Sequence, residues 1–117
     1  MTNDILEQLP EELRKQSIDL SITMGVNSLA WYSSLIPQIV RWCWENDVAI
    51  LGGDVLELDK DGQLSYTYDN WYINFDSKLI WRDFVAKSLE YAVQNVQSYE
   101  KLLLPKALVF DLVFHTQ

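Results

Sequence analysis

The strongest structural signal in this sequence is a β-hairpin around residues 59–62. The run Asp59-Lys60-Asp61-Gly62 suits a tight turn, because an Asp-Gly pair readily adopts positive backbone φ angles. Before the turn, residues 48–58 are mostly apolar and contain two adjacent glycines, which is typical of a buried strand with a bulge. After it, residues 63–68 alternate large side chains with small polar ones, as in a half-buried strand. We therefore expect antiparallel strands at the centre of the fold.

The C-terminal half predicts one long helix and a last strand. From Asp76 or Ser77, either of which could cap the helix, to about Glu100, apolar residues recur at helical spacing. No proline or glycine interrupts this pattern. Pro105 is expected to end the connection that follows, and residues 107–115 are predicted to form a strand with apolar side chains at the even positions through 114.

The N-terminal half predicts short helical turns followed by a second main helix. Residues 3–16 carry leucines at helical spacing, but Pro10 interrupts them. Ser28 is expected to cap a helix over residues 29–45, and Pro37 should kink or divide that helix.

These elements predict an α+β fold in one domain, residues 1–117. The expected order is α-β-β-α-β with short N-terminal helical turns. Because the hairpin reverses the chain and the long helix returns it, the last strand should lie beside the first strand and antiparallel to it. We therefore expect a three-stranded antiparallel sheet of order 2-1-3, packed against two main helices.

If helices cover one face of this sheet, the other face is expected to be mixed in polarity. Its predicted residues are Val109, Asp111 and Val113, with Ser65 and Thr67 from the hairpin. The sequence leaves open whether the N-terminal turns cover this face or a partner uses it.

The charge balance narrows the class of partner. The 117 residues include 17 acidic and 9 basic side chains, so the formal net charge of −8 disfavours nucleic acid and anionic membranes. The N-terminus has no signal-peptide pattern, and no apolar stretch approaches the roughly 20 residues of a membrane helix. We expect a soluble cytoplasmic protein. The single Cys43 excludes an internal disulfide and is expected to be a buried, inert thiol.

No catalytic constellation emerges from the residue inventory. The one histidine, His115, lies two residues from the C-terminus, where an exposed side chain is expected. The chain has no Gly-x-Ser-x-Gly elbow and no Gly-rich phosphate loop. We predict that the protein is not an enzyme and binds no cofactor or metal. A hydrolase that uses a pair of the 17 acids is the alternative that this inventory leaves open.

Most of the net charge falls on one segment of the chain. Residues 47–76 hold seven acids and one lysine, a net charge of −6, and are also rich in aromatic side chains. Rings can anchor a protein interface by burial while acids steer a basic partner toward it. In the alternative, the acids solubilise an edge strand and the rings fill a small core. The predicted partner-binding residues are Glu57, Asp59, Asp61, Tyr66, Tyr68, Asp69 and Tyr72.

Four features follow one another along the chain: Ala30-Trp31 in a helix, Ile50-Leu51-Gly52-Gly53-Asp54-Val55, Asn70-Trp71, and a helix with Ser88 and Ala92. This pattern, over roughly residues 28–114, resembles the immunity protein 40 family of bacterial conflict systems. In such families a small cytoplasmic protein binds the toxin domain of a polymorphic or contact-dependent toxin and protects the producing cell. The resemblance implies an inhibitor rather than an enzyme, and it does not identify the toxin.

The residues that match the family motif are Gly52, Gly53, Asp54 and Trp71. The glycines are expected to allow a bulge or close packing. A buried Asp54 without partners would be costly, so we expect it to accept a hydrogen bond from the backbone around Asn70 or from the Trp71 indole N–H. These four residues are therefore predicted to be structural, with toxin contacts on the acids around them.

The sequence thus predicts an immunity protein that binds the C-terminal domain of its toxin, for example a nuclease, and masks its active cleft. The partner should present the basic surface that such a toxin uses to hold RNA or DNA phosphates. A non-enzymatic adaptor that recognises a protein unrelated to toxins is the alternative. Gene neighbourhood separates the two, because an immunity gene should lie directly beside a large toxin gene.

Overall fold

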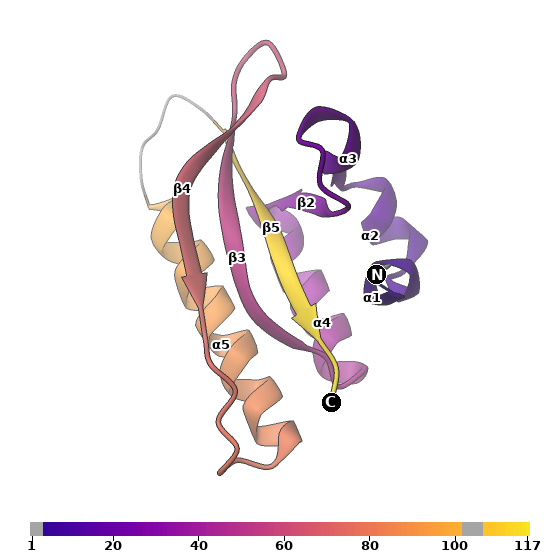
Figure 1. Cartoon of the computed structure of the whole chain (residues 1–117), viewed down its shortest axis with the longest axis vertical. Helices are drawn as coiled ribbons and strands as arrows, with labels where there is room; N and C mark the ends of the chain where they lie inside the picture. The colour runs from indigo at the N-terminus through magenta and orange to yellow at the C-terminus, as the bar shows by residue number, and fades with distance from the viewer. Residues whose placement is uncertain (1–3, 102–106) are drawn as a thin grey trace.

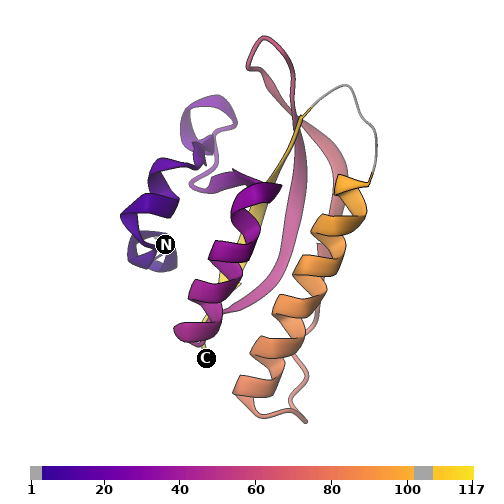
Figure 2. The same ribbon diagram turned by 180° about the vertical axis from the view of Figure 1, so that it is seen from behind.

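The chain forms a five-stranded antiparallel sheet with two helices across one face (Figures 1 and 2). The computed structural model describes residues 4–101 and 107–117. The strand order is β1-β2-β5-β3-β4, and all neighbouring strands are antiparallel. The elements are α1 (Asp4–Gln8), α2 (Glu11–Lys15), β1 (Ile18–Asp19), α3 (Leu20–Thr23), β2 (Leu29–Tyr32), the 3₁₀ turn η1 (Ser33–Leu35), α4 (Ile36–Glu45), β3 (Ala49–Leu58), β4 (Leu64–Tyr72), α5 (Trp81–Glu100) and β5 (Ala107–His115).

The predicted hairpin is present and forms the neighbouring strands β3 and β4. Gly62 in its turn has a φ of 81°, a conformation that glycine adopts without strain. β4 extends beyond the predicted end at Tyr68, so the Asn70-Trp71 pair lies within a strand. β5 has the predicted bounds and pairs antiparallel with β3. Pro105 lies outside the described residues.

The predicted three-stranded sheet is wrong, because two further strands extend it beyond β5. The segment Leu29–Tyr32, expected to begin a helix, forms β2 and pairs with β5, and β1 completes this edge. Trp31 of β2 is fully buried, and its indole N–H donates to the Leu13 carbonyl at 2.8 Å. Long-range pairing and burial of this kind override a local helical pattern, because a single helical turn is marginal by itself.

α4 begins later than predicted, at Ile36. Pro37 lies in its first turn, where the missing N–H has no helical partner to lose, so it begins the helix rather than kinking it. Ser28 consequently caps no helix, and its hydroxyl instead donates to the Asp111 carboxylate.

α5 packs its apolar stripe against the sheet beside α4 (Figure 2). It begins at Trp81 rather than at Asp76 or Ser77, because the Asp76 carboxylate accepts from the backbone N–H of Lys78 (3.0 Å) in a turn that precedes the helix. Buried Ser88 accepts a hydrogen bond from the backbone N–H of Ile50 (3.1 Å) and thereby ties α5 to the central strand. The largest fully buried side chains include Trp31, Phe84, Phe110, Leu9 and Ile39.

The other face of the sheet is covered only in part. Near the hairpin turn, Leu20 of α3 forms a small second cluster with Leu56 of β3 and Val109 of β5. Further along β5, Val113 is 45% exposed. Figure 1 looks onto this face and shows no helix crossing most of β3, β4 and β5. The N-terminal turns therefore cover one end of the face and leave the rest open.

Candidate functional site

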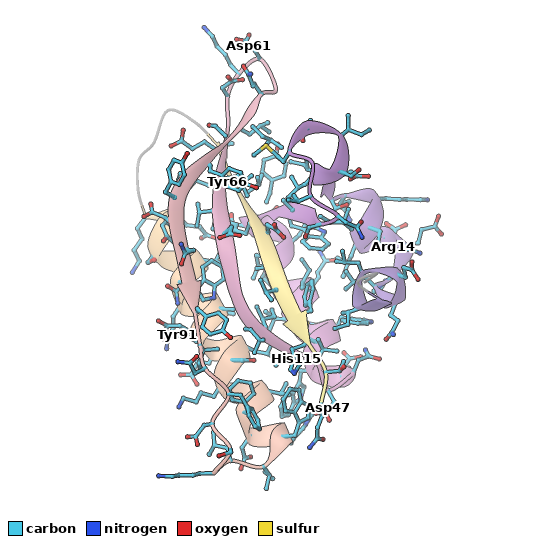
Figure 3. The ribbon with its side chains drawn as sticks, viewed as in Figure 1. Arg14, Asp47, Asp61, Tyr66, Tyr91 and His115 are labelled. Atoms are coloured by element: carbon cyan, nitrogen blue, oxygen red, sulfur yellow. The ribbon has the colours of Figure 1, made fainter. Side chains whose placement is uncertain are left out.

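The two turn acids, Asp59 and Asp61, differ in what their side chains contact. One carboxylate oxygen of Asp59 accepts from the backbone N–H groups of Asp61 and Gln63, both at 2.9 Å. Such local bonds shape a turn, so the Asp59 carboxylate helps to hold the hairpin. The Asp61 side chain is exposed at the tip (Figure 3). Asp61 is therefore the better placed of the two to meet a partner.

Glu57 and Asp69 lie toward the helix-covered side of the sheet. Glu57 is opposite Ser65 and Leu108, and Leu108 packs against the main core. Since directly opposite residues share a face, Ser65 is not on the open side as predicted. Burial raises the pKa of Tyr99 on α5, and the negative charge of nearby Asp69 raises it further. These two acids therefore do not share a face with Tyr66 and Tyr72, with which they were predicted to form one binding surface.

Tyr66 and Tyr72 lie on the side of the sheet that has no helices. In the pairing of β4 with β3, Tyr66 is opposite Leu56 and Tyr72 is opposite Gly52. The two tyrosines are 40% and 60% exposed, and Figure 3 shows Tyr66 on the near side of the strands. Alternation along a strand predicts which side chains share a face, but it does not say which set faces the helices.

A bulge between these tyrosines turns Tyr68 outward. Two extra residues of β4 lie between its contacts with Asp54 and Leu56, and the Thr67 hydroxyl donates to the Val55 carbonyl at 2.8 Å. Tyr68 has a φ of 68°, an uncommon value for a residue with a side chain, and is 88% exposed. Its ring lies 6.4 Å from that of Tyr66, measured between centroids. Bulges commonly redirect side chains in this way.

Gly52 and Gly53 occupy positions that leave no room for a side chain. A Cβ atom on Gly52 would collide with the backbone oxygen of Trp71, and one on Gly53 would lie 2.5 Å from a ring atom of the same tryptophan. The Trp71 side chain covers Gly53 on the helix side, where its ring centroid lies 6.2 Å from that of Phe110. Both glycines therefore permit a close approach between β3 and β4.

Asp54 does not form the expected hydrogen bond with Trp71. Asp54 is opposite Asn70, whereas Trp71 is opposite Gly53, so the two side chains point to opposite faces. Trp71 is 5% exposed, and its indole N–H has no hydrogen-bond partner within the described ranges. Asp54 is exposed, and across residues 4–101 and 107–117 its carboxylate makes no hydrogen bond or ion pair.

Asp111 was predicted to lie on the face without helices, but it was not among the predicted partner-binding residues. It lies on β5 directly opposite Asp54, on the helix-free side, and accepts a hydrogen bond from the Ser28 hydroxyl at 2.5 Å. Burial raises the pKa of Asp111, the Ser28 hydrogen bond lowers it, and the charge of Asp54 adds to the increase. The available signal was an aspartate within an otherwise apolar strand. Like charges directly opposite each other destabilise a sheet.

Acidic side chains occur on both helices and strands, whereas the lysines and arginines within these elements all lie on helices. The five strands carry five acids and no lysine or arginine: Asp19, Asp54, Glu57, Asp69 and Asp111. α5 carries Arg82 and Lys87 together with three acids, Asp83, Glu90 and Glu100. We call the helix-free surface formed by Asp54, Tyr66, Asn70, Tyr72, Asp111 and Val113 the open face. This surface is acidic at its centre and aromatic at its edges.

The groups capable of chemistry are dispersed in the structure. His115 is exposed at the end of β5, with its ring centroid 5.8 Å from that of Trp81. Cys43 is fully buried, as predicted, and burial raises the pKa of its thiol to about 12. Within the described ranges, no three His, Cys, Asp or Glu side chains gather to hold a metal. In the same ranges, no helix combines the length and apolarity needed to cross a membrane.

A small α+β protein that exposes acidic and aromatic side chains on one side of its sheet fits the class of proteins that bind another protein. The family model of immunity protein 40 matches residues 19–114, and the chain belongs to this family. The resemblance noted in the sequence is thereby confirmed. Membership implies an immunity protein against a toxin, and immunity proteins are generally non-catalytic. Searches of curated proteins and of solved structures gave no match.

Proposed function

We propose that the protein neutralises one toxin domain by binding it and covering its active cleft, without catalysis. Membership of the immunity protein 40 family is the observation that carries this proposal. Such a protein acts in the cytoplasm of the cell that produces the toxin, where it meets the C-terminal toxin domain. Its task is tight and specific binding, which requires a complementary surface rather than reactive groups.

The charge of the protein supports a basic partner. Its formal net charge is −8, and its sheet has acids but no lysine or arginine. A toxin domain that acts on RNA or DNA needs lysine and arginine side chains to hold phosphates. An acidic inhibitor that covers those side chains would prevent nucleic acid from binding. Its association should be fast and sensitive to salt, because long-range attraction steers the encounter.

The hairpin residues have different roles in this proposal. Exposed Tyr66, Tyr68 and Tyr72 serve as anchors, because tyrosine provides a large contact area and loses little conformational freedom. Asp61 at the tip steers the partner. The remaining acids, Glu57, Asp59 and Asp69, strengthen the negative field around these residues.

Co-expression with the adjacent gene tests this function. The C-terminal domain encoded beside this gene should arrest growth when produced alone, and co-expression of this protein should restore growth. The two proteins should also co-purify. A toxin domain from an unrelated system serves as the specificity control, and this protein should not rescue its effect. Continued growth arrest and no co-purification, with folded protein present, would contradict the proposal.

A further inference from the structure

Among the residues that the structure describes, the acids at the centre of the open face have no partner of opposite charge. Asp54 and Asp111 are directly opposite each other on neighbouring strands. The hydrogen bond from Ser28 to Asp111 satisfies one of the four lone-pair sites on that carboxylate. Burial disfavours the charged form of Asp111, and the Asp54 charge adds to this cost. A cation held between the two strands would lower this cost, because it would interact favourably with both carboxylates.

Within residues 4–101 and 107–117, no lysine or arginine is placed to do this. The strands around the pair contain no lysine or arginine. Arg82, at the start of α5, already lies over the Trp44 ring, 3.2 Å from its centroid, and pairs with Asp47 at 3.2 Å. Arg82 thus has both an aromatic partner and an acidic partner within its own chain. The open face has aromatic and acidic side chains of the same kinds, but the strands that form it carry no arginine or lysine.

The side chains around the pair suit a protein partner. Along β3, one neighbouring row places Tyr72 and Val113 on either side of Gly52. On the other side of the pair, beyond the bulge, Tyr66 lies opposite Leu56. An acidic centre with aromatic and apolar side chains around it can exclude water from a bound cation and strengthen its attraction to the carboxylates.

We propose that the open face is the toxin-binding surface and that Asp54 and Asp111 together receive one arginine or lysine side chain of the toxin domain. This inference rests on the proposed function and places the centre of the interface on the open face rather than at the turn acids Asp59 and Asp61. Charge complementarity selects this occupant, since Asp54 and Asp111 are opposite each other on the open face and the described strands carry no lysine or arginine. A second copy of this chain is the competing occupant.

Charge reversal tests this surface with a matched control. Asp54→Lys changes the charge of the open face, and Glu90→Lys makes the same change at an exposed position on α5. Calorimetric titration with an inactive form of the adjacent toxin domain should show at least about 30-fold weaker binding for Asp54→Lys. Glu90→Lys should bind within about twofold of the wild type. If Asp54→Lys does not fold, Asp54→Asn and Asp111→Asn provide milder variants, each expected to weaken binding by about tenfold.

The outcomes distinguish this inference from the proposed function. If the wild type binds the toxin domain and Asp54→Lys binds equally well, the open face is not the interface and the inference alone fails. Equal weakening by Glu90→Lys would also overturn it. If the wild type does not bind the domain, the proposed function fails and the inference fails with it. Sedimentation of the free protein should show a monomer. A dimer that Asp54→Lys dissociates without loss of toxin binding would identify a second copy as the occupant and overturn the inference.

Discussion

On the helix-covered face of β3, β4 and β5, most side chains are buried in the main core, whereas several large side chains on the open face remain exposed. Phe110 is buried among aromatic rings beneath α5. The next residue along β5, Asp111, points the other way toward another acid. Trp71 and Tyr72 differ in the same manner on β4, since one is buried and the other is largely exposed.

The comparison indicates that the two faces have separate tasks. The helix-covered face buries the apolar area that stabilises the fold. The open face includes a pair of like charges, which we expect to reduce stability, and exposed rings that contribute little to the core. Functional sites commonly depart from the arrangement of greatest stability. Substitutions on the two faces should therefore have effects of different kinds.

The largest expected difference compares two positions on β5. Phe110→Ala should lower the free energy of unfolding by about 3–5 kcal/mol, because it leaves a cavity in the core. Val113→Ala, on the open face of the same strand, should cost less than about 1 kcal/mol. Urea denaturation measures both values. Similar losses for the two variants would show that the faces do not differ in their contribution to stability.

A smaller loss is expected at the contact between Gly53 and Trp71. Gly53→Ala should destabilise the protein by about 1–3 kcal/mol, because the added methyl group would overlap the indole. Ser65→Ala, at an exposed position on β4, is the control and should have little effect. The double variant Gly53→Ala with Trp71→Leu should lose less stability than the two single changes combined. Strict additivity would contradict the proposed contact.

On the open face, removing a charge should raise stability. Asp111→Asn keeps an acceptor for the Ser28 hydroxyl and removes the charge opposite Asp54, so it should stabilise the protein by about 0.5 kcal/mol at pH 7. The measurement is urea denaturation at several pH values. A less stable variant at pH 7 would show that the ionised pair is not a cost to the fold.

The gain in stability from Asp111→Asn should also depend on pH. The pKa of Asp111 is raised above its ordinary value of 3.8 in the folded protein, chiefly by burial and further by Asp54, so the folded state keeps a proton that the unfolded chain has lost. The loss of folding free energy caused by ionised Asp111 is absent below about pH 3.8 and complete above the pKa of Asp111 in the folded state. The advantage of Asp111→Asn should therefore disappear in acid. Asp19, whose pKa is lowered by bonds from Ser21, titrates in both proteins and cancels in the difference.

The smallest effect is expected at the hairpin tip. Asp61→Lys should slow association with the toxin domain by about threefold at low salt and leave the dissociation rate and the stability unchanged, as for a charge at the rim of an interface. Stopped-flow mixing at two salt concentrations measures this. A strong increase in the dissociation rate would instead place the tip within the interface.

Much of the fold could be predicted because its long elements have strong periods. The hairpin carries its own turn residues, and β5 has an apolar side chain at every even position from 108 to 114. β1 and β2 could not be predicted in the same way, because they have two and four residues and depend on pairing with β5 at the other end of the sequence. The added strands are why the predicted three-stranded sheet was wrong.

The sequence indicated which segment carries the candidate site, but not on which face of the sheet its residues lie. The concentration of acids and rings in residues 47–76 pointed to the hairpin, but the side of the sheet on which each residue lies depends on register and on the bulge at Tyr68. The opposition of Asp54 and Asp111 depends on pairing between strands that are far apart in the sequence. No local sequence pattern predicts that these two residues lie opposite each other.

The most direct test of the open face is a paired measurement on Asp54→Asn. The urea midpoint reports stability, and calorimetry with the inactive toxin domain reports affinity. We predict a midpoint equal to or higher than that of the wild type, together with about tenfold weaker binding. A lower midpoint with unchanged affinity would contradict this account, because it would make Asp54 part of the scaffold rather than part of the binding surface.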